Sequence, residues 1–452
     1  MNRRDLVRSG VTLAAFAGAQ LKGEPARPGA NDRIRVALIG CGGMGKMDLK
    51  DFQSFPEVEV VAICDVDQNQ IAKTLPLVTG KAPRTEGDYR IILASRDVDV
   101  AIIATPDHWH AKICVDACEA GKDVYVEKPI ATSVREARLM VDAARKHNRV
   151  IQVGIQQRSG SHFQRAVELV RKGEIGKVIY AEAWNHAHNT NRGNGPAAPE
   201  KPPAGLNWDM WLGPAPMAPY HKGIHPVAWR NYFDYGGGNL ADWGVHLLDI
   251  IQWALEVETP TSVHTSGGKL WTNDDRTAPD TLNALYEYPG VMVNYTHMNH
   301  CNYGRSGRFY GIIFHGSDAA LLLDRSGYEI VPCTTKSIDP AGEAFRGAFD
   351  DMIGTGTYFT GTRAPEHGST SLQHVPHIGN FLACLRSRKR PTGDIEVGFH
   401  ATLPCLLGNM SYRTGHKLVW DPKTERVSNY EPANALLTRH YRAPWTLAGL
   451  EG

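Results

Sequence analysis

The chain of 452 residues has few cysteines, no surplus of charge and no long apolar run. Its eight cysteines include no Cys-x-x-Cys pair, so neither a disulfide framework nor a zinc ribbon is indicated. The 49 basic and 48 acidic residues nearly cancel, which argues against a nucleic-acid binder driven by overall charge. No uncharged stretch reaches the ~20 residues of a membrane-spanning helix, so we expect no membrane anchor. The length suggests two to three domains, at roughly 100 to 200 residues per domain.

The first 19 residues have the pattern of an export signal. Arg3, Arg4 and Arg8 form a basic start, residues 11–17 form a short apolar stretch, and residues 17–19 (Ala-Gly-Ala) form a small-x-small cleavage site. The adjacent arginines resemble a twin-arginine signal, which predicts export of the folded protein to the periplasm. An amphipathic N-terminal helix is the alternative.

A glycine-rich turn follows the first predicted strand, residues 34–39. The turn leads into a helix-compatible segment that extends to Phe55. Its first glycine permits a tight turn, its second lets a pyrophosphate approach the backbone, and its third lets the helix pack on the strand. The N–H groups at the start of that helix can bind phosphates. The turn therefore predicts a dinucleotide site formed by Gly40, Gly42, Gly43, Met44 and Gly45.

A carboxylate follows the second predicted strand, residues 58–63. Asp65 stands twenty residues after Gly45, where it would accept hydrogen bonds from the adenosine ribose hydroxyls. Residues 66–68 (Val-Asp-Gln) offer no cation for a 2′-phosphate, and Asp65 would repel one, so we expect NAD rather than NADP. A Rossmann-like turn that binds nothing is the alternative.

Strands and helices alternate through the first domain. We expect further elements at residues 89–94, 98–104, 111–120, 123–126, 134–147 and 150–153. The alternation predicts an α/β Rossmann fold with a doubly wound parallel sheet over residues 33–155, preceded by a linker over residues 20–32. Ligands of such sheets bind beyond the carboxyl ends of the strands. This rule directs attention to residues 105–110 (Thr-Pro-Asp-His-Trp-His) and 127–129 (Glu-Lys-Pro).

The pattern changes in residues 156–452. Helices are expected at 162–172, 377–388 and 397–414, and strands at 178–184, 281–288, 291–297, 309–315 and 319–323. These elements predict an α+β domain with an open, mostly antiparallel sheet and helices on one face. Residues 334–373 receive no assignment.

A long loop over residues 189–223 interrupts this domain. Seven of the ten tryptophans lie between residues 184 and 271, so we expect the loop to fold over the cleft. Trp229, Arg230 and Tyr235 are the weaker candidates for substrate contacts, and packing of the loop explains them equally well.

Four motifs together resemble one known family. They are the glycine turn, residues 105–110, Glu127-Lys128-Pro129 and residues 242–246 (Asp-Trp-Gly-Val-His), in the family's order and approximate spacing. On these motifs the chain resembles the glucose-fructose oxidoreductase, inositol dehydrogenase and rhizopine-catabolism (Gfo/Idh/MocA) family over nearly all of residues 33–445. Residues 236–246 are similar to its exported bacterial members, which are often known only as predicted dehydrogenases.

The resemblance implies roles for three residues. Lys128 is the expected catalytic lysine, His246 the general base, and Asp242 the residue that positions His246 or the substrate. Asp242 and His246 are four apart in a helix-compatible stretch, so they should share a helix face. A surface lysine and a structural histidine are the alternatives. The further cofactor candidates are Thr105, Pro106, His108, His110, Glu127 and Lys128 itself.

The implied reaction is NAD-dependent oxidation of a secondary alcohol on a sugar, polyol or glycoside. The alternative is an NAD-dependent glycosidase or lyase that uses transient oxidation with no net redox change, and a third is a non-catalytic sugar-binding protein. The resemblance also implies a homodimer or homotetramer. We expect no metal, because His108-x-His110 and His186-x-His188 lie in predicted loops without Glu or Cys at zinc-type spacing.

Overall fold

The computed structural model describes residues 33–186, 195–300, 304–305, 307–332 and 364–450. The predicted export signal (1–19) and linker (20–32) lie outside the described residues, as do His188, part of the long loop and most of residues 334–373. No helix in the described ranges is long and apolar enough to cross a membrane.

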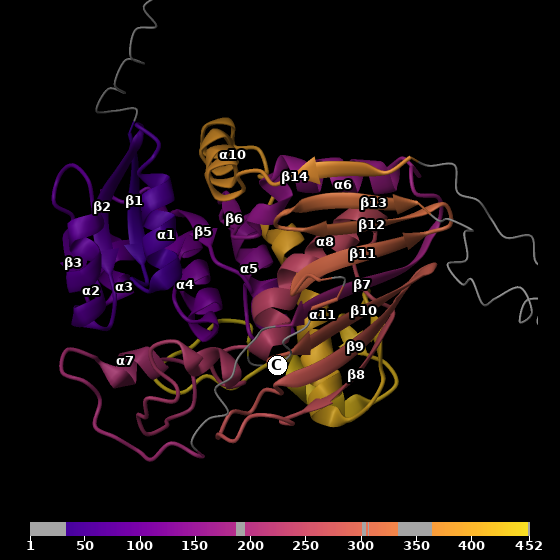
Figure 1. Ribbon diagram of the computed structural model, residues 1–452. Helices are drawn as coiled ribbons and strands as arrows, with labels where there is room; N and C mark the ends of the chain where they lie inside the picture. Colours follow the sequence, from indigo (N-terminus) through magenta and orange to yellow (C-terminus); the bar gives the residue numbers. More distant parts are fainter. Residues whose placement is uncertain (1–32, 187–194, 301–303, 306, 333–363, 451–452) are drawn as a thin grey trace, which may run out of the picture.

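The first sheet is six-stranded and parallel, in the order β3-β2-β1-β4-β5-β6 (Figure 1). Its strands are β1 (Ile34–Ile39), β2 (Val58–Cys64), β3 (Arg84–Glu86), β4 (Val100–Ile103), β5 (Asp123–Val126) and β6 (Ile151–Val153). The connecting helices are α1 (Gly43–Phe52), α2 (Gln68–Thr74), α3 (Tyr89–Ala94), α4 (Asp107–Glu119) and α5 (Val134–Lys146). The doubly wound α/β prediction is confirmed.

Helix α4 begins earlier than the sequence predicts. It starts at Asp107, directly after Pro106, and not near Ala111. Asp107 occupies the first turn, where its carboxylate favours the positive end of the helix dipole. This start brings Asp107 to the carboxyl end of the sheet, where ligands of such folds bind.

The second sheet has ten strands in the order β14-β13-β12-β11-β7-β10-β9-β8-β15-β16. The strands are β7 (Val178–His186), β8 (Ser262–Gly268), β9 (Thr281–Tyr288), β10 (Val291–Met298), β11 (Tyr310–Gly316), β12 (Ala319–Asp324), β13 (Gly327–Pro332), β14 (Glu366–Ser369), β15 (Leu418–Asp421) and β16 (Arg426–Val427). Only the described pair β7 and β10 runs parallel, so the sheet is mostly antiparallel, as predicted.

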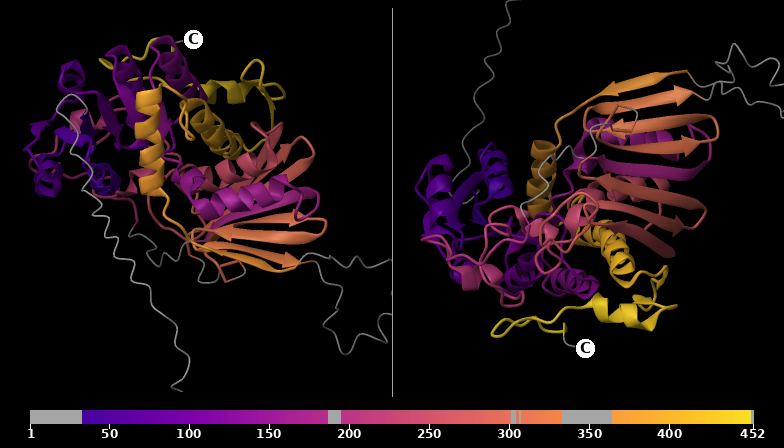
Figure 2. Two further views of the ribbon diagram at one scale, coloured as in Figure 1. Left: turned by 90° about the horizontal axis from the view of Figure 1, so that it is seen from above. Right: turned by 60° about the horizontal axis from the view of Figure 1, so that its bottom comes forward.

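Helices α6 (Ser161–Arg171), α8 (Val245–Leu255) and α11 (Ile395–Thr414) cover one face of the second sheet (Figure 1). Helix α10 (His374–Ser387), expected to complete this domain, packs instead on the first. Its Phe381 contacts Phe52 of α1 and Tyr125 of β5, with ring centroids 6.3 and 5.9 Å apart. Both views in Figure 2 show α10 between the first domain and the strands of the second.

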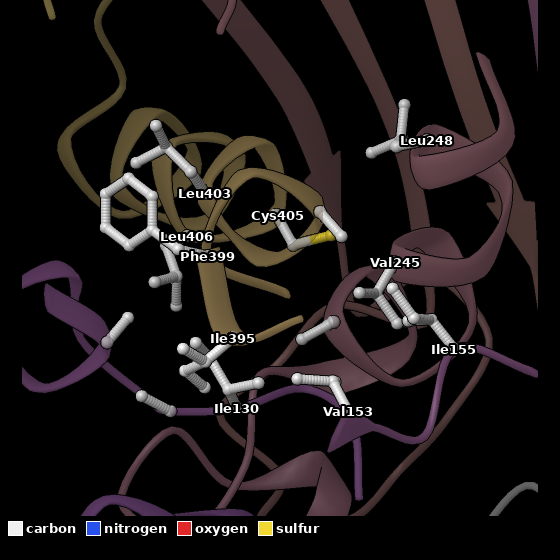
Figure 3. Close-up of a cluster of buried hydrophobic side chains, with 14 of the residues drawn as sticks. Ile130, Val153, Ile155, Val245, Leu248, Ile395, Phe399, Leu403, Cys405 and Leu406 are labelled. Atoms are coloured by element: carbon white, nitrogen blue, oxygen red, sulfur yellow. The ribbon is translucent and has the colours of Figure 1, made fainter. Parts of the chain in front are cut away.

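A continuous apolar core joins the two domains. Ile130 and Val153 of the first domain pack against Ile395 of α11 and Val245 of α8 (Figure 3). A Cβ at Gly398 of α11 would collide with the Val153 side chain, so the absence of a side chain there lets α11 approach β6 closely. This shared core fixes the second domain beside the carboxyl ends of the first sheet.

Candidate active site

A cavity of about 610 Å³ lies where the carboxyl ends of β1, β2, β4 and β5 face the second domain. The glycine turn lines one side of it. Gly40 has φ +100°, and a Cβ there would lie 2.6 Å from the carbonyl carbon of Ala104. A Cβ at Gly45 would collide with the carbonyl oxygen of Gly40. Both positions therefore require glycine.

Gly42 and Gly43 have open space where a side chain would stand, with no described atom within 4 Å of a built Cβ. Gly42 caps α1 without a side-chain hydrogen bond, so the first N–H groups of that helix remain available. A pyrophosphate fits this combination of open space and helix N-terminus. The residues present therefore fit a dinucleotide.

Asp65 lies at the end of β2 and lines the same cavity. One carboxylate oxygen accepts the N–H of Cys41 at 2.7 Å, and the other accepts the N–H of Asp67 at 2.9 Å. Each oxygen keeps a lone pair for a ribose hydroxyl. Burial raises the pKa of Asp65 to about 6, so the carboxylate is largely ionised at pH 7.

The long loop of the second domain closes over this region through a strap, residues 204–207. The N–H of Gln68 donates to the carbonyl of Gly205, and the N–H of Asn207 donates to the carbonyl of Val66, both at 2.9 Å. Beyond the strap, Trp211 lines the cavity. The described part of the loop thus encloses the cavity, in line with the tryptophan-based expectation.

Lys128 stands at the end of β5 and is tied to the second domain. Its Nζ donates to the Asp242 carboxylate and to the Asp242 backbone carbonyl, both at 2.8 Å. Arg230 Nε donates to the same carboxylate oxygen at 3.3 Å. Burial acts to raise the pKa of Asp242, but Lys128 and Arg230 outweigh it and the net shift is downward. Asp242 is therefore ionised and holds Lys128 in place.

The expectation that Asp242 and His246 share an α-helical face needs correction. Residues Leu240–Gly244 form a π-helical turn, and α8 begins only at Val245. The wider turn directs Asp242 to Lys128, so the carboxylate positions the lysine. Among the described residues, Asp242 forms no hydrogen bond or ion pair with the His246 imidazole. A π turn within a helix has no reliable local sequence signal and often occurs at functional sites.

His246 is buried and faces the cavity. Its Nδ1 finds no hydrogen-bond partner among the described residues. Burial lowers the pKa of His246 well below its usual value, and the charges of Lys128 and Arg325 lower it further. The imidazole is therefore neutral and able to accept a proton.

Two carboxyl groups of the cavity hold protons near neutral pH. Burial raises the pKa of Glu127 to about 7, although Lys128 opposes the shift. Burial likewise raises the pKa of Asp107 to about 8, with Arg230 opposing it. The Asp107 carboxylate lies against Gly236, where a Cβ would be 3.2 Å from its oxygen. The cavity thus combines an ionised Asp242 with a protonated Asp107.

The remaining sequence candidates divide into two groups. Thr105, Pro106, His110 and Trp229 line the cavity together with Met44. Three others do not line it: Gly45, His108 and Tyr235.

The ring nitrogens of His108 and His110 lie within hydrogen-bond distance of backbone carbonyls. The two ring nitrogens of His110 lie 2.8 Å from the Pro129 carbonyl and 2.9 Å from the Thr105 carbonyl. His108 Nε2 lies 3.0 Å from the carbonyl of Trp211, and its ring packs against Tyr235. His108 therefore anchors the loop and does not contact the cavity.

Several residues that line the cavity are not among the candidates that the sequence offers. Asp107 stood inside a quoted motif, but its burial depends on the second domain. Trp243 stood inside the quoted motif of residues 242–246, whereas Arg325 and His374 belong to no local motif. Gln156, which follows the last strand of the first sheet, also lines the cavity.

The neighbours of Gln156 turn away from the cavity. The side chain of Gln157 lies 2.7 Å from the Tyr310 hydroxyl, and Arg158 forms a bidentate ion pair with Asp249. These residues link the end of the first domain to the second.

The fold combines a Rossmann-type dinucleotide-binding domain with a second α/β domain, and one cavity lies between them. A family profile described as "Oxidoreductase family, NAD-binding Rossmann fold" matches residues 34–155, and one described as "Oxidoreductase family, C-terminal alpha/beta domain" matches residues 177–269. The chain belongs to the Gfo/Idh/MocA oxidoreductase family. The family resemblance and the NAD-binding type of the first domain are thereby confirmed.

The curated relatives match only part of the chain. A "Glycosyl hydrolase family 109 protein" of Shewanella pealeana is 29% identical over 207 residues, which cover 40% of this chain and 45% of the relative. An "Alpha-N-acetylgalactosaminidase" of Shewanella oneidensis is 32% identical over 157 residues, which cover 33% of this chain and 34% of the relative. The matches therefore span less than half of each of these relatives.

Solved structures match nearly the whole fold. The structure of levoglucosan dehydrogenase in complex with NADH and L-sorbose aligns with a TM-score of 0.65 at 16% identity. The alignment covers 86% of this chain and 99% of that chain. At this identity the likeness shows the arrangement of the two domains.

Proposed function

We propose that the protein oxidises a secondary alcohol on a sugar, polyol or glycoside with NAD as the cofactor. The observation that carries the proposal is the arrangement of Lys128. Two of its three N–H donors are held by Asp242, which leaves the third for a substrate oxygen beside the neutral His246. The glycine turn and Asp65 supply the nucleotide site in the same cavity.

Each protein group then has one task. Lys128 donates to the substrate oxygen and stabilises the negative charge that develops there. His246 accepts the hydroxyl proton, because burial keeps its imidazole neutral. Asp242 and Arg230 hold Lys128 in position. Bound NAD supplies the hydride acceptor.

The experiment is a panel of sugars, polyols and glycosides added to the NAD-loaded protein, with the absorbance of reduced nicotinamide as the readout. The native protein should reduce its nicotinamide with at least one compound class, and His246→Ala should lower the rate by about 10²- to 10⁴-fold. Equal rates in both proteins would refute the assigned base. A control variant is His400→Ala, because His400 is a partly buried histidine outside the cavity.

A second candidate function is glycoside cleavage or elimination by transient oxidation. The observation that favours it is the protonated Asp107, because a simple alcohol oxidation needs no second proton donor. Oxidation at one ring carbon acidifies the neighbouring C–H. After a base removes that proton, the leaving group departs with a proton from Asp107. Water addition and return of the hydride then complete a cycle without net redox.

Leaving-group dependence tests this candidate. Nitrophenyl glycosides need little help from an acid, whereas alkyl glycosides need a proton on the departing oxygen. Asp107→Asn should therefore slow alkyl glycosides by a larger factor than nitrophenyl glycosides. Product release with a lasting rise in reduced nicotinamide would contradict the closed cycle.

We further propose export by the twin-arginine route and assembly into a homodimer or homotetramer. The first proposal rests on residues 1–19, and a cell that expresses the chain with Arg3→Lys and Arg4→Lys should retain it in the cytoplasm. The second rests on the family resemblance, and light scattering of the purified protein tests it. A periplasm poor in free nucleotides would also require tight retention of NAD.

A further inference from the structure

Positive charge exceeds negative charge on the substrate side of the cavity. Lys128, Arg230 and Arg325 all line it. Asp242 is ionised, but its carboxylate is already shared between Lys128 and Arg230. Asp107 carries a proton at neutral pH because burial raises its pKa to about 8. Neither of these carboxyl groups therefore balances the positive charge of Arg325.

Arg325 occupies the turn between β12 and β13, at the end of the sheet nearest the first domain (Figure 1). Its guanidinium carbon lies 5.3 Å from the ring centroid of Trp243 and 5.5 Å from that of Tyr310. With the Gln157 amide oriented to suit its neighbours, Arg325 Nε donates to the amide oxygen at 3.1 Å. These neutral groups orient the guanidinium without cancelling its charge.

Neighbouring arginines show what a paired guanidinium looks like in this protein. Arg158 forms a bidentate pair with Asp249, and Arg308 reaches Asp324 at 2.8 Å. Within the described ranges, by contrast, no carboxylate forms an ion pair with Arg325. Burying part of a cation without a counter-ion costs free energy, unless an anion binds to it.

The position of Arg325 separates this charge from the nucleotide site. Phosphates belong at the glycine turn of the first domain, where Gly42 and Gly43 leave space. Arg325 comes from the second sheet and lies near His246, since its charge contributes to the depressed pKa of that imidazole after burial and Lys128. An anion at Arg325 would therefore sit on the molecule that His246 contacts.

We propose that Arg325 recognises an anionic group on the substrate, which makes the substrate an acidic sugar. The group is a carboxylate or a phosphate, because both accept two parallel hydrogen bonds from a guanidinium. The inference rests on the proposed function, since it names a substrate class for the same cavity. Trp243 and Tyr310 flank the guanidinium, Gln157 accepts from Nε, and the Tyr310 hydroxyl accepts a further hydrogen bond. The other N–H groups of the guanidinium remain for the ligand.

The test measures binding separately from turnover. Calorimetry with the NAD-loaded protein compares D-glucuronate and D-galacturonate with their neutral methyl esters, and the hexose 6-phosphates with the parent hexoses. The variants are Arg325→Gln, which removes the positive charge, and Arg325→Lys, which keeps the charge but loses the two parallel N–H donors of the guanidinium. Arg308→Gln is the matched control, because it removes a cation from the segment just before β11 without touching the cavity.

The native protein should bind one class of acidic sugar about 10- to 100-fold more tightly than its neutral counterpart, as expected for a charge-assisted hydrogen bond. Arg325→Gln should bring that ratio close to one, Arg325→Lys should retain part of it, and Arg308→Gln should preserve it. Tighter binding of the uronates would identify a carboxylate as the group that Arg325 binds, and tighter binding of the hexose 6-phosphates would identify a phosphate. Equal affinity of acid and neutral compounds, or no binding of any acidic sugar, would overturn the inference.

Turnover in the same samples separates the two proposals. If acidic sugars bind in an Arg325-dependent way but none reduces the bound nicotinamide or is cleaved, the proposed function fails and the anion site stands. If neutral sugars react and the acid preference is absent, the proposed function stands and the anion site fails. Thermal unfolding of each variant excludes a general loss of structure.

Discussion

Replacement of Lys128 by Met removes the ammonium while keeping a chain of similar length. The ammonium makes two hydrogen bonds of 2.8 Å to Asp242 and has one donor left for the substrate. Loss of that last donor should lower kcat/KM by about 10²- to 10⁴-fold, or about 3–5 kcal/mol of transition-state stabilisation. Asp242 keeps Arg230 at 3.3 Å, so the free energy of unfolding should fall by only about 1–3 kcal/mol.

The assay follows nicotinamide reduction with the best substrate of the panel, alongside the NAD content of each preparation. Lys112→Met is the matched control. Lys112 pairs with Asp116 at 2.7 Å, and its side chain is 17% exposed, against 15% for Lys128, but it lies outside the cavity. If Lys128→Met keeps more than about a tenth of the native activity while binding NAD normally, the role given to Lys128 is wrong.

Three further outcomes follow from the cavity geometry. Gly45→Ala should lower the free energy of unfolding by about 1–3 kcal/mol or more, because the added Cβ collides with the Gly40 carbonyl. Gly43→Ala should keep the thermal unfolding midpoint but lose NAD affinity, because its Cβ enters open space. Equal unfolding midpoints in both variants would contradict the close packing at Gly45. Asp65→Ser should weaken NAD binding about 10-fold or more and should reduce the preference for NAD over NADP, measured by titration with both nucleotides. An unchanged preference for NAD would show that Asp65 does not select the cofactor. Burial raises the pKa of Asp107 to about 8, so this group's stabilising contribution is complete below about pH 4 and is lost as the pH rises to about 8. The thermal unfolding midpoint of the nucleotide-free protein should fall over this pH range, and the fall should be smaller in Asp107→Asn.

The glycine turn, Asp65 and Lys128 could be predicted because each depends on a local pattern. A strand followed by closely spaced glycines fixes the phosphate end of the cavity, and the next strand end brings Asp65 to the same edge. The position of Lys128 follows from its place after β5. For these residues, the rule that ligands bind at the carboxyl ends of parallel strands was sufficient.

The contacts between the domains could not be predicted in the same way. Lys128 and Asp242 are 114 positions apart, and the π turn that brings them together has no local signal. Arg325 reaches the cavity from a hairpin turn of the second sheet. The protonated state of Asp107 depends on how completely the second domain covers it. Such features depend on tertiary packing, and a single sequence does not record them.

Mass spectrometry of the nucleotide released by denaturing the purified, never-supplemented protein shows whether the cavity binds a nicotinamide nucleotide. We expect NAD or NADH at close to one molecule per chain, enclosed beneath the strap and bound through Asp65. NADP in its place would contradict the role of Asp65. A protein that carries no nucleotide and binds neither NAD nor NADH on titration would contradict nicotinamide chemistry in this cavity.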